Sequence, residues 1–92
     1  MNLIKIEKEE IVRLHFSSGD VLESEAQKRN RELALRNAVI LGNTEKQKCR
    51  IVFHAEEGDG FVETTVWAVT DKYICLKGGL ALLIASVVDV IL

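Results

Sequence analysis

The pattern of apolar residues changes from a helical period to alternation close to Lys46. Before this point, residues 25–41 are rich in Ala, Leu, Arg, Glu and Lys, which favour helix. After it, apolar and polar residues alternate, and β-branched and aromatic residues prevail between glycine-bearing breaks. One helical segment followed by strands with short connections predicts an α+β fold.

The boundaries of the helix are marked by side chains that cap helices. Ser24 and Gln27 have the S-x-x-Q spacing of a capping box, in which the serine oxygen accepts from the third amide of the helix. Gly42 and Asn43 are residues that commonly end a helix. The sequence therefore predicts one helix over residues 25–41.

Five strands are expected after the helix, and the connections between them are short. Short connections favour antiparallel neighbours, so the strands should form a meander. Such a meander is expected to curl into a small open barrel, because curvature hides exposed strand edges. The alternative is an open sheet with the helix packed on one face. The expected strands are 47–55, 61–69, 73–77, 80–84 and 87–91.

The N-terminal segment has two possible structures. Residues 11–16 alternate and are followed by the turn-forming residues 17–20, which predicts a hairpin with a short second arm at Val21–Leu22. The alternative is a helix through residues 3–10.

Length and charge limit the classes of function. The 92 residues predict a single domain over 1–92, which excludes a multidomain enzyme. Twelve basic and fourteen acidic residues give a net charge of -2, so only a local patch could attract a polyanion. The apolar segment 80–92 is too short to span a bilayer as a helix, which takes roughly 20 residues.

The two cysteines, Cys49 and Cys75, have neither the number of a disulfide framework nor the spacing of a zinc site. Both are expected to pack as small apolar residues. Residues 1–10 carry five charges and do not resemble the apolar core of a secretory signal. We therefore expect a cytoplasmic protein.

The segment ETTVWAVTDKYICLKGG, residues 63–79, resembles the core of a group of short uncharacterised bacterial proteins. This resemblance implies only a free-standing bacterial domain, and it carries over no functional residue. The order of a helix followed by a meander resembles the SH3-like and Sm-like small barrels. The Sm-like resemblance implies RNA binding as an alternative function, although apolar residues follow Gly78 and Gly79 where that family has a basic glycine motif.

Basic residues on the helix are the candidate contacts for nucleic acid or another anion. With Lys46, Lys48 and Arg50 they would form one positive face if the helix and the first long strand lie side by side. The aromatic residues fall on expected strands, so the sequence favours a solvated charged helix face over nucleic-acid contact. The candidate helix residues are Lys28, Arg29, Arg31 and Arg36.

No catalytic residue, cofactor site or metal site is predicted. Cys49 and His54 are five residues apart, so they should point to opposite faces of a strand. The acidic loop 56–60 lacks the spacing of a calcium-binding EF-hand and is interpreted as a solvated turn. His15 has no partner that the sequence indicates. We therefore expect a protein that is not an enzyme.

Self-association is the function that the sequence favours. Apolar residues occupy both faces of the segment 80–84, and a one-sided sheet can bury only one of them. Trp67 is expected in the core, with an anchor for a protein partner as the alternative. We expect a small binding or assembly module that forms a homo-oligomer. The candidate self-association residues are Leu80, Leu82, Leu83 and Ile84.

Overall fold

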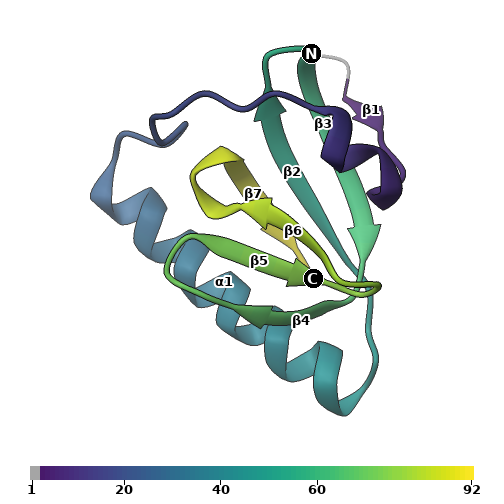
Figure 1. Ribbon diagram of the computed structural model, residues 1–92. Helices are drawn as coiled ribbons and strands as arrows, with labels where there is room; N and C mark the ends of the chain where they lie inside the picture. The colour runs from purple at the N-terminus through teal and green to yellow at the C-terminus, as the bar shows by residue number, and fades with distance from the viewer. Residues whose placement is uncertain (1–2) are drawn as a thin grey trace.

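The computed structural model describes residues 3–92, so the first two residues of the predicted domain lie outside the described residues. It has an α+β fold, as the sequence predicts, with one α-helix and two sheets (Figure 1). In chain order the elements are β1 (Ile4–Lys5), the 3-10 helix η1 (Lys8–Arg13), α1 (Glu25–Thr44), β2 (Cys49–Ala55), β3 (Gly58–Thr64), β4 (Val66–Val69), β5 (Tyr73–Leu76), β6 (Leu80–Leu83), the 3-10 helix η2 (Ile84–Ser86) and β7 (Val87–Ile91).

The helix α1 begins where the capping box predicts. The Ser24 hydroxyl accepts a hydrogen bond from the backbone N–H of Gln27 at 3.4 Å. The predicted end at Gly42 was wrong, because the helix continues to Thr44. Gly42 instead lies against β4, where a Cβ atom would come within 2.3 Å of the Val66 carbonyl oxygen. Its small size serves close packing, not helix termination.

The predicted strand 61–69 is two strands that belong to different sheets. The chain bends at Thr65, between β3 and β4. Thr64, Thr65 and Val66 are all buried, and this run interrupts the alternation of a regular strand. The four-stranded sheet A has the order β1-β3-β2-β7, and the three-stranded sheet B has the order β4-β5-β6.

The last strand does not continue the predicted meander. A turn at residues 85–86 was expected to pair it with β6, but β7 pairs antiparallel with β2. The 3-10 helix η2 separates the two strands, and the Ser86 hydroxyl donates to the Leu83 carbonyl at 2.7 Å within this turn. Because η2 redirects the chain, β7 returns to sheet A. In the described residues neither sheet closes into a barrel, so the open-sheet alternative is confirmed.

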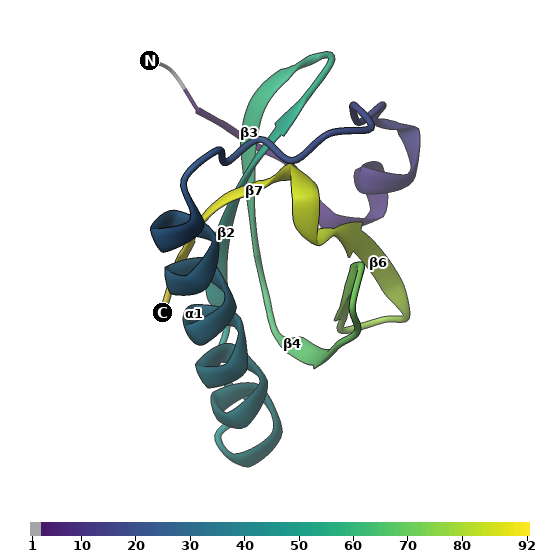
Figure 2. The same cartoon turned by 90° about the vertical axis from the view of Figure 1, so that its left-hand side faces the viewer.

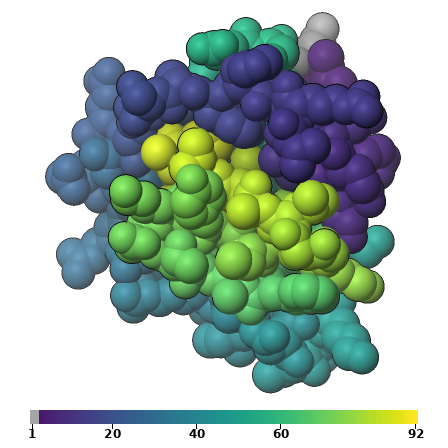
Figure 3. All heavy atoms as spheres, in the orientation of Figure 1, coloured from purple at the N-terminus to yellow at the C-terminus, as the bar shows by residue number. Residues whose placement is uncertain are grey.

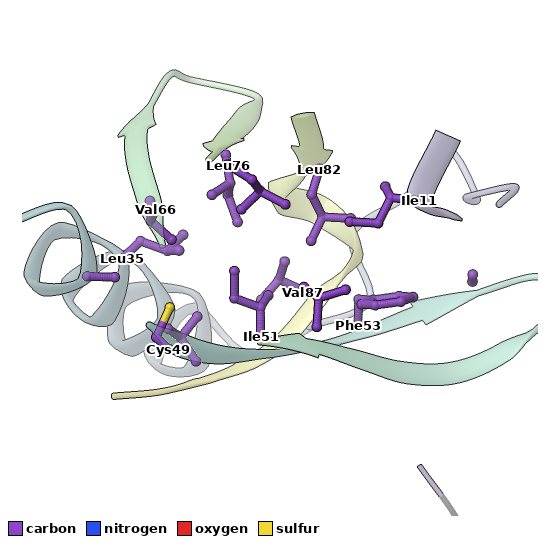
Figure 4. Packing of buried hydrophobic residues seen from close by; sticks show 14 residues of the cluster. Ile11, Leu35, Cys49, Ile51, Phe53, Val66, Leu76, Leu82 and Val87 are labelled. Atoms are coloured by element: carbon purple, nitrogen blue, oxygen red, sulfur yellow. The ribbon is translucent and has the colours of Figure 1, made fainter. Parts of the chain in front are cut away.

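The core lies between the two sheets (Figure 4). Side chains of sheet B, including Leu76 and Leu82, face Ile51 and Phe53 of sheet A. The helix α1 packs against β4 and β7, and η1 packs against β6 and β3. Figure 2 shows α1 along one side of the molecule and η1 with β6 on the opposite side. The two helical elements therefore cover the open sides between the sheets.

The prediction of an N-terminal hairpin was wrong. Only β1 is a strand in this region, and it pairs parallel with β3. Part of the alternative helix is present as η1, whose Ile11 is buried while Val12 is exposed. Residues 14–24, here called the strap, then cross the molecule in an extended path (Figure 1). The strap bonds to the β2–β3 turn, to α1 and to residue 85 in place of a second hairpin arm.

Candidate functional site

The predicted basic helix face is not a free positive surface. Arg31 is buried, and its guanidinium donates to both carboxylate oxygens of Asp20 and to the Val87 carbonyl. The sequence did not indicate these partners, because Asp20 is eleven residues from Arg31 along the chain and Val87 belongs to a different element. Arg31 therefore joins the strap, α1 and β7, and it is wrong as a contact for nucleic acid.

The exposed basic residues of this helix face are interleaved with acidic ones. Lys28 pairs with Glu25 at 3.6 Å, and Arg36 pairs with Glu32 at 2.7 Å. The helix packs on β4 and β7, so Lys28, Arg29 and Arg36 do not continue into the basic residues of β2. An open cavity of about 520 Å³ beside this helix is lined by Lys28 and Arg36 but also by Glu32 and Asp71. Its mixed charge favours no anion.

The predicted self-association residues separate onto different surfaces. Leu82 is buried in the core, and Leu80 packs partly against it, so neither is free for a partner. Ile84 begins η2 and packs against the core cluster. Only Leu83 points away from the core, because neighbouring residues of a strand face opposite sides. Leu83 is half-buried on the outward side and stays a prediction for self-association, whereas Leu80, Leu82 and Ile84 pack toward the core and do not form an exposed set with it.

The outward side of sheet B is apolar. Its register pairs Tyr73 with Leu83, and places Cys75 between Ala68 and Ala81. Their neighbours along the strands, Ile74, Leu76 and Leu82, are fully buried on the inward side. No charged residue occurs among the five, and Figure 3 shows the atoms of β4–β6 uncovered in the centre of this view. We call these residues the apolar face: Ala68, Tyr73, Cys75, Ala81 and Leu83.

The outward side of sheet A has the opposite character. Arg50 lies 4.6 Å above the Phe61 ring and also pairs with Glu63 at 3.3 Å. His54 pairs with Asp59 on the same side of the β2–β3 hairpin. These ionisable groups suit a solvated sheet surface. The outward side of sheet A therefore carries charged groups, whereas the apolar face of sheet B carries none.

His15 has a partner that the sequence did not indicate. Its ring lies 2.6 Å from Glu57, and its backbone N–H donates to the other oxygen of that carboxylate at 3.0 Å. The pKa of Glu57 is lowered to about 2, mainly by the hydrogen bond from the His15 backbone and secondly by the hydrogen bond to the His15 ring. The hydrogen bond to Glu57 in turn raises the pKa of His15. The predicted solvated turn is therefore also the attachment point of the strap.

The two cysteines lie in different surroundings. Cys49 is buried in the core, where burial raises the pKa of its thiol, while Cys75 is half-buried on the apolar face. Cys49 and His54 point to opposite sides of β2, as their spacing predicts. Within residues 3–92, no group of three His, Cys, Asp or Glu side chains could hold a metal ion.

Two aromatic residues on the expected strands, where core packing is the usual outcome, are exposed in the structure. Trp67 is 47% exposed and Tyr73 is 45% exposed. The pairing of β4 with β5 is irregular between Val66 and Ala68, so Trp67 stands at a bulge and turns outward. The alternation in β5 places Tyr73 outward, opposite the buried Ile74. A core position for these rings was wrong, and the alternative of a partner anchor fits their exposure.

Neither a protein-family model, nor a curated protein, nor a solved structure matches this chain. No helix within the described part of the chain is long and apolar enough to cross a membrane.

Proposed function

We propose that this protein is a non-enzymatic binding and assembly module that associates with a second copy of itself through the apolar face. The observation that carries the proposal is the composition of that face: five side chains in register, none charged, on the outward side of a sheet whose inward side is already buried. Covering such a surface removes apolar area from water.

The shape of the apolar face suits a two-fold contact. Tyr73 and Leu83 form a ridge across β5 and β6, and the next outward row consists of the smaller Ala68, Cys75 and Ala81. In a two-fold interface the same patch is used by both copies, so the patch must complement itself. The ridge of one copy can occupy the low row of the other, and no like charges would meet across the axis.

We further propose a location in the bacterial cytoplasm. Two free thiols support this proposal, because reducing compartments preserve them. The resemblance of residues 63–79 to short bacterial proteins supports a bacterial source.

The experiment is sedimentation equilibrium at micromolar protein concentration. We expect a mass of two or more 10.3 kDa chains for the unmodified protein. Leu83→Lys should shift the mass to that of one chain, because it would place an unpaired charge within the apolar contact. The matched control is Ile40→Lys, on the solvent side of α1 where the side chain is 58% exposed. This control should not change the mass.

Two outcomes would overturn the proposal. One is a single-chain mass for the unmodified protein across the micromolar range. The other is an oligomer that persists in both Leu83→Lys and Tyr73→Lys, with circular dichroism confirming that both variants are folded.

A further inference from the structure

A second surface, independent of the apolar face, combines an exposed aromatic ring with unpaired lysines. It is a cleft of about 320 Å³ at the corner where α1 ends, β4 begins and β5 ends. In Figure 1 these three chain segments meet at the lower right. The residues that line the cleft are Gly42, Asn43, Lys46, Thr65, Trp67 and Lys77.

Contacts between α1 and β4 fix the backbone that carries the ring. The bulge in β4 turns Trp67 outward, and the Asn43 side chain donates to the Trp67 carbonyl at 3.2 Å and to the Val39 carbonyl at 2.9 Å. Gly42 allows α1 to approach β4 closely at this point. The indole is therefore held beside the end of the helix with nearly half of its surface exposed.

The two lysines of the cleft are positioned by the backbone. The Lys77 N–H donates to the Thr65 carbonyl at 3.0 Å, which fixes the end of β5 to the bend between the sheets. Lys46 follows the helix with a φ of 53°, a left-handed conformation that glycine or asparagine adopts at lower cost.

The charged residues that line the cleft are both lysines, Lys46 and Lys77. Among the residues that the structure describes, no acidic side chain lines the cleft. An adjoining cavity shares Lys77 and adds Lys5, Lys8 and Lys48, together with Glu7, Glu9 and Glu63. The Lys8 ammonium extends the basic surface to the β5–β6 turn, where a Cβ on Gly78 would lie 3.6 Å from it. Within residues 3–92 these five lysines form no ion pair, whereas Lys28, Arg31, Arg36 and Arg50 are all paired.

We propose that this cleft binds a nucleotide unit, with its base stacked on Trp67 and its phosphate held by Lys46 and Lys77. Base stacking on an exposed aromatic ring next to cationic side chains is a general mode of nucleotide binding that does not depend on base identity. The volume of the cleft is at the lower end of the range for small-ligand sites, roughly 300 Å³ upward, which suits one nucleotide. The unit belongs either to a free nucleotide or to a single-stranded nucleic acid.

Fluorescence provides a direct test, because Trp67 is the only tryptophan of the chain. Titration at low salt with uridine monophosphate, oligouridylate and oligothymidylate should quench Trp67 emission, since a stacked base contacts the indole. Equal affinity per nucleotide for the monophosphate and the oligomers would identify a free nucleotide as the ligand. Tighter binding of the oligomers would identify a single strand.

Four variants separate stacking from charge. Trp67→Ala should lower the affinity about tenfold, measured by calorimetry, and Trp67→Phe should restore most of it. Lys77→Ala should reduce the slope of log affinity against log salt by about 0.7 for an oligomer, the effect of one phosphate contact. Lys46→Gly should weaken binding several-fold without lowering stability, because glycine fits the left-handed position. Lys72→Ala, on the β4–β5 turn away from the cleft, is the matched control and should bind normally.

The proposal is wrong if none of the three ligands quenches Trp67 at low salt, or if Lys46→Gly and Lys77→Ala both bind as the unmodified protein does. It is also wrong if polyglutamate or acidic lipid vesicles quench Trp67 as strongly as the nucleotides, since binding would then need charge alone. The same titration on Leu83→Lys should give unchanged affinity, so failure of self-association and failure of nucleotide binding are distinguishable.

Discussion

The buried Arg31 and the partly exposed Asp20 form a two-point ion pair, with distances of 3.0 Å from Nη1 to Oδ1 and 2.6 Å from Nη2 to Oδ2. Nη1 also donates to the Val87 carbonyl at 2.9 Å, so one guanidinium joins the strap to α1 and to the first residue of β7. The hydrogen bond from Arg31 holds the pKa of Asp20 below its ordinary value. Three chain segments depend on this contact for their relative positions.

Breaking this pair should destabilise the protein strongly. Asp20→Ala would leave the Arg31 charge buried without its partner, and we expect the free energy of unfolding to fall by about 2–4 kcal/mol. Urea denaturation monitored by circular dichroism would measure the change. Glu32→Ala, which breaks the exposed pair with Arg36, should cost less than about 1 kcal/mol. Equal losses in the two variants would contradict a structural role for the pair of Arg31 and Asp20.

Gly42 should not tolerate a larger side chain, although it lies within a helix. Alanine normally favours a helix over glycine by about 1 kcal/mol. Here a Cβ would meet the Val66 carbonyl oxygen at 2.3 Å and the Thr65 methyl at 3.0 Å, so Gly42→Ala should lower the free energy of unfolding by about 1–3 kcal/mol. Gly19→Ala is the control, because a Cβ there meets nothing within 4 Å. A more stable Gly42→Ala protein, measured by thermal denaturation, would show that α1 can move away from β4.

The contact between His15 and Glu57 should make stability depend on pH. The pKa of His15 is raised from 6.5 in the folded protein, so its contribution is complete below pH 6.5 and is lost as the pH rises through the raised value. The pKa of Glu57 is lowered from 4.5 to about 2, so its contribution is complete above pH 4.5 and is lost as the pH falls toward 2. Both contributions are complete between pH 4.5 and 6.5.

Glu57→Gln should therefore reduce stability most within this pH window. The measurement is the urea midpoint of the unmodified protein and of the variant, inside the window and on both sides of it. The difference between the two midpoints should become smaller both below and above the window. Because both groups are exposed, high salt should reduce the difference. A constant difference at all pH values would assign the effect to packing instead of charge.

Asp89 should protect the edge of sheet A from pairing with another chain. Its carboxylate accepts a hydrogen bond from the Val90 backbone N–H at 2.8 Å, and β7 is an edge strand of the sheet. A charged side chain that accepts a hydrogen bond from a backbone N–H of an edge strand opposes the addition of another strand there. Asp89→Ala should increase light scattering at high protein concentration, whereas Asp89→Asn retains an acceptor and should scatter less. Identical scattering by both variants and the unmodified protein would exclude this role.

Local patterns in the sequence determined most of the secondary structure. The capping box fixed the start of α1 at Glu25, and alternation located β2, β5, β6 and β7 to within two residues. The α+β class followed from these elements, because propensity and hydrophobic period act over a few residues. Leu83 was named together with Leu80, Leu82 and Ile84, and because both faces of this segment are apolar, the local pattern did not show which of them points outward.

Contacts between distant residues were decided only by the tertiary structure. The bend at Thr65 and the turn at η2 distribute the strands between two sheets, and no local pattern shows which strand β7 will pair with. Arg31 has an ordinary helical sequence context, yet it is buried because Asp20 and Val87 surround its guanidinium. Lys46, Trp67 and Lys77 line one cleft because α1 approaches β4 at Gly42 and β5 ends beside Thr65. The proximity of these three residues depends on how the helix and the strands pack together. The hydrophobic period of each segment does not determine that packing.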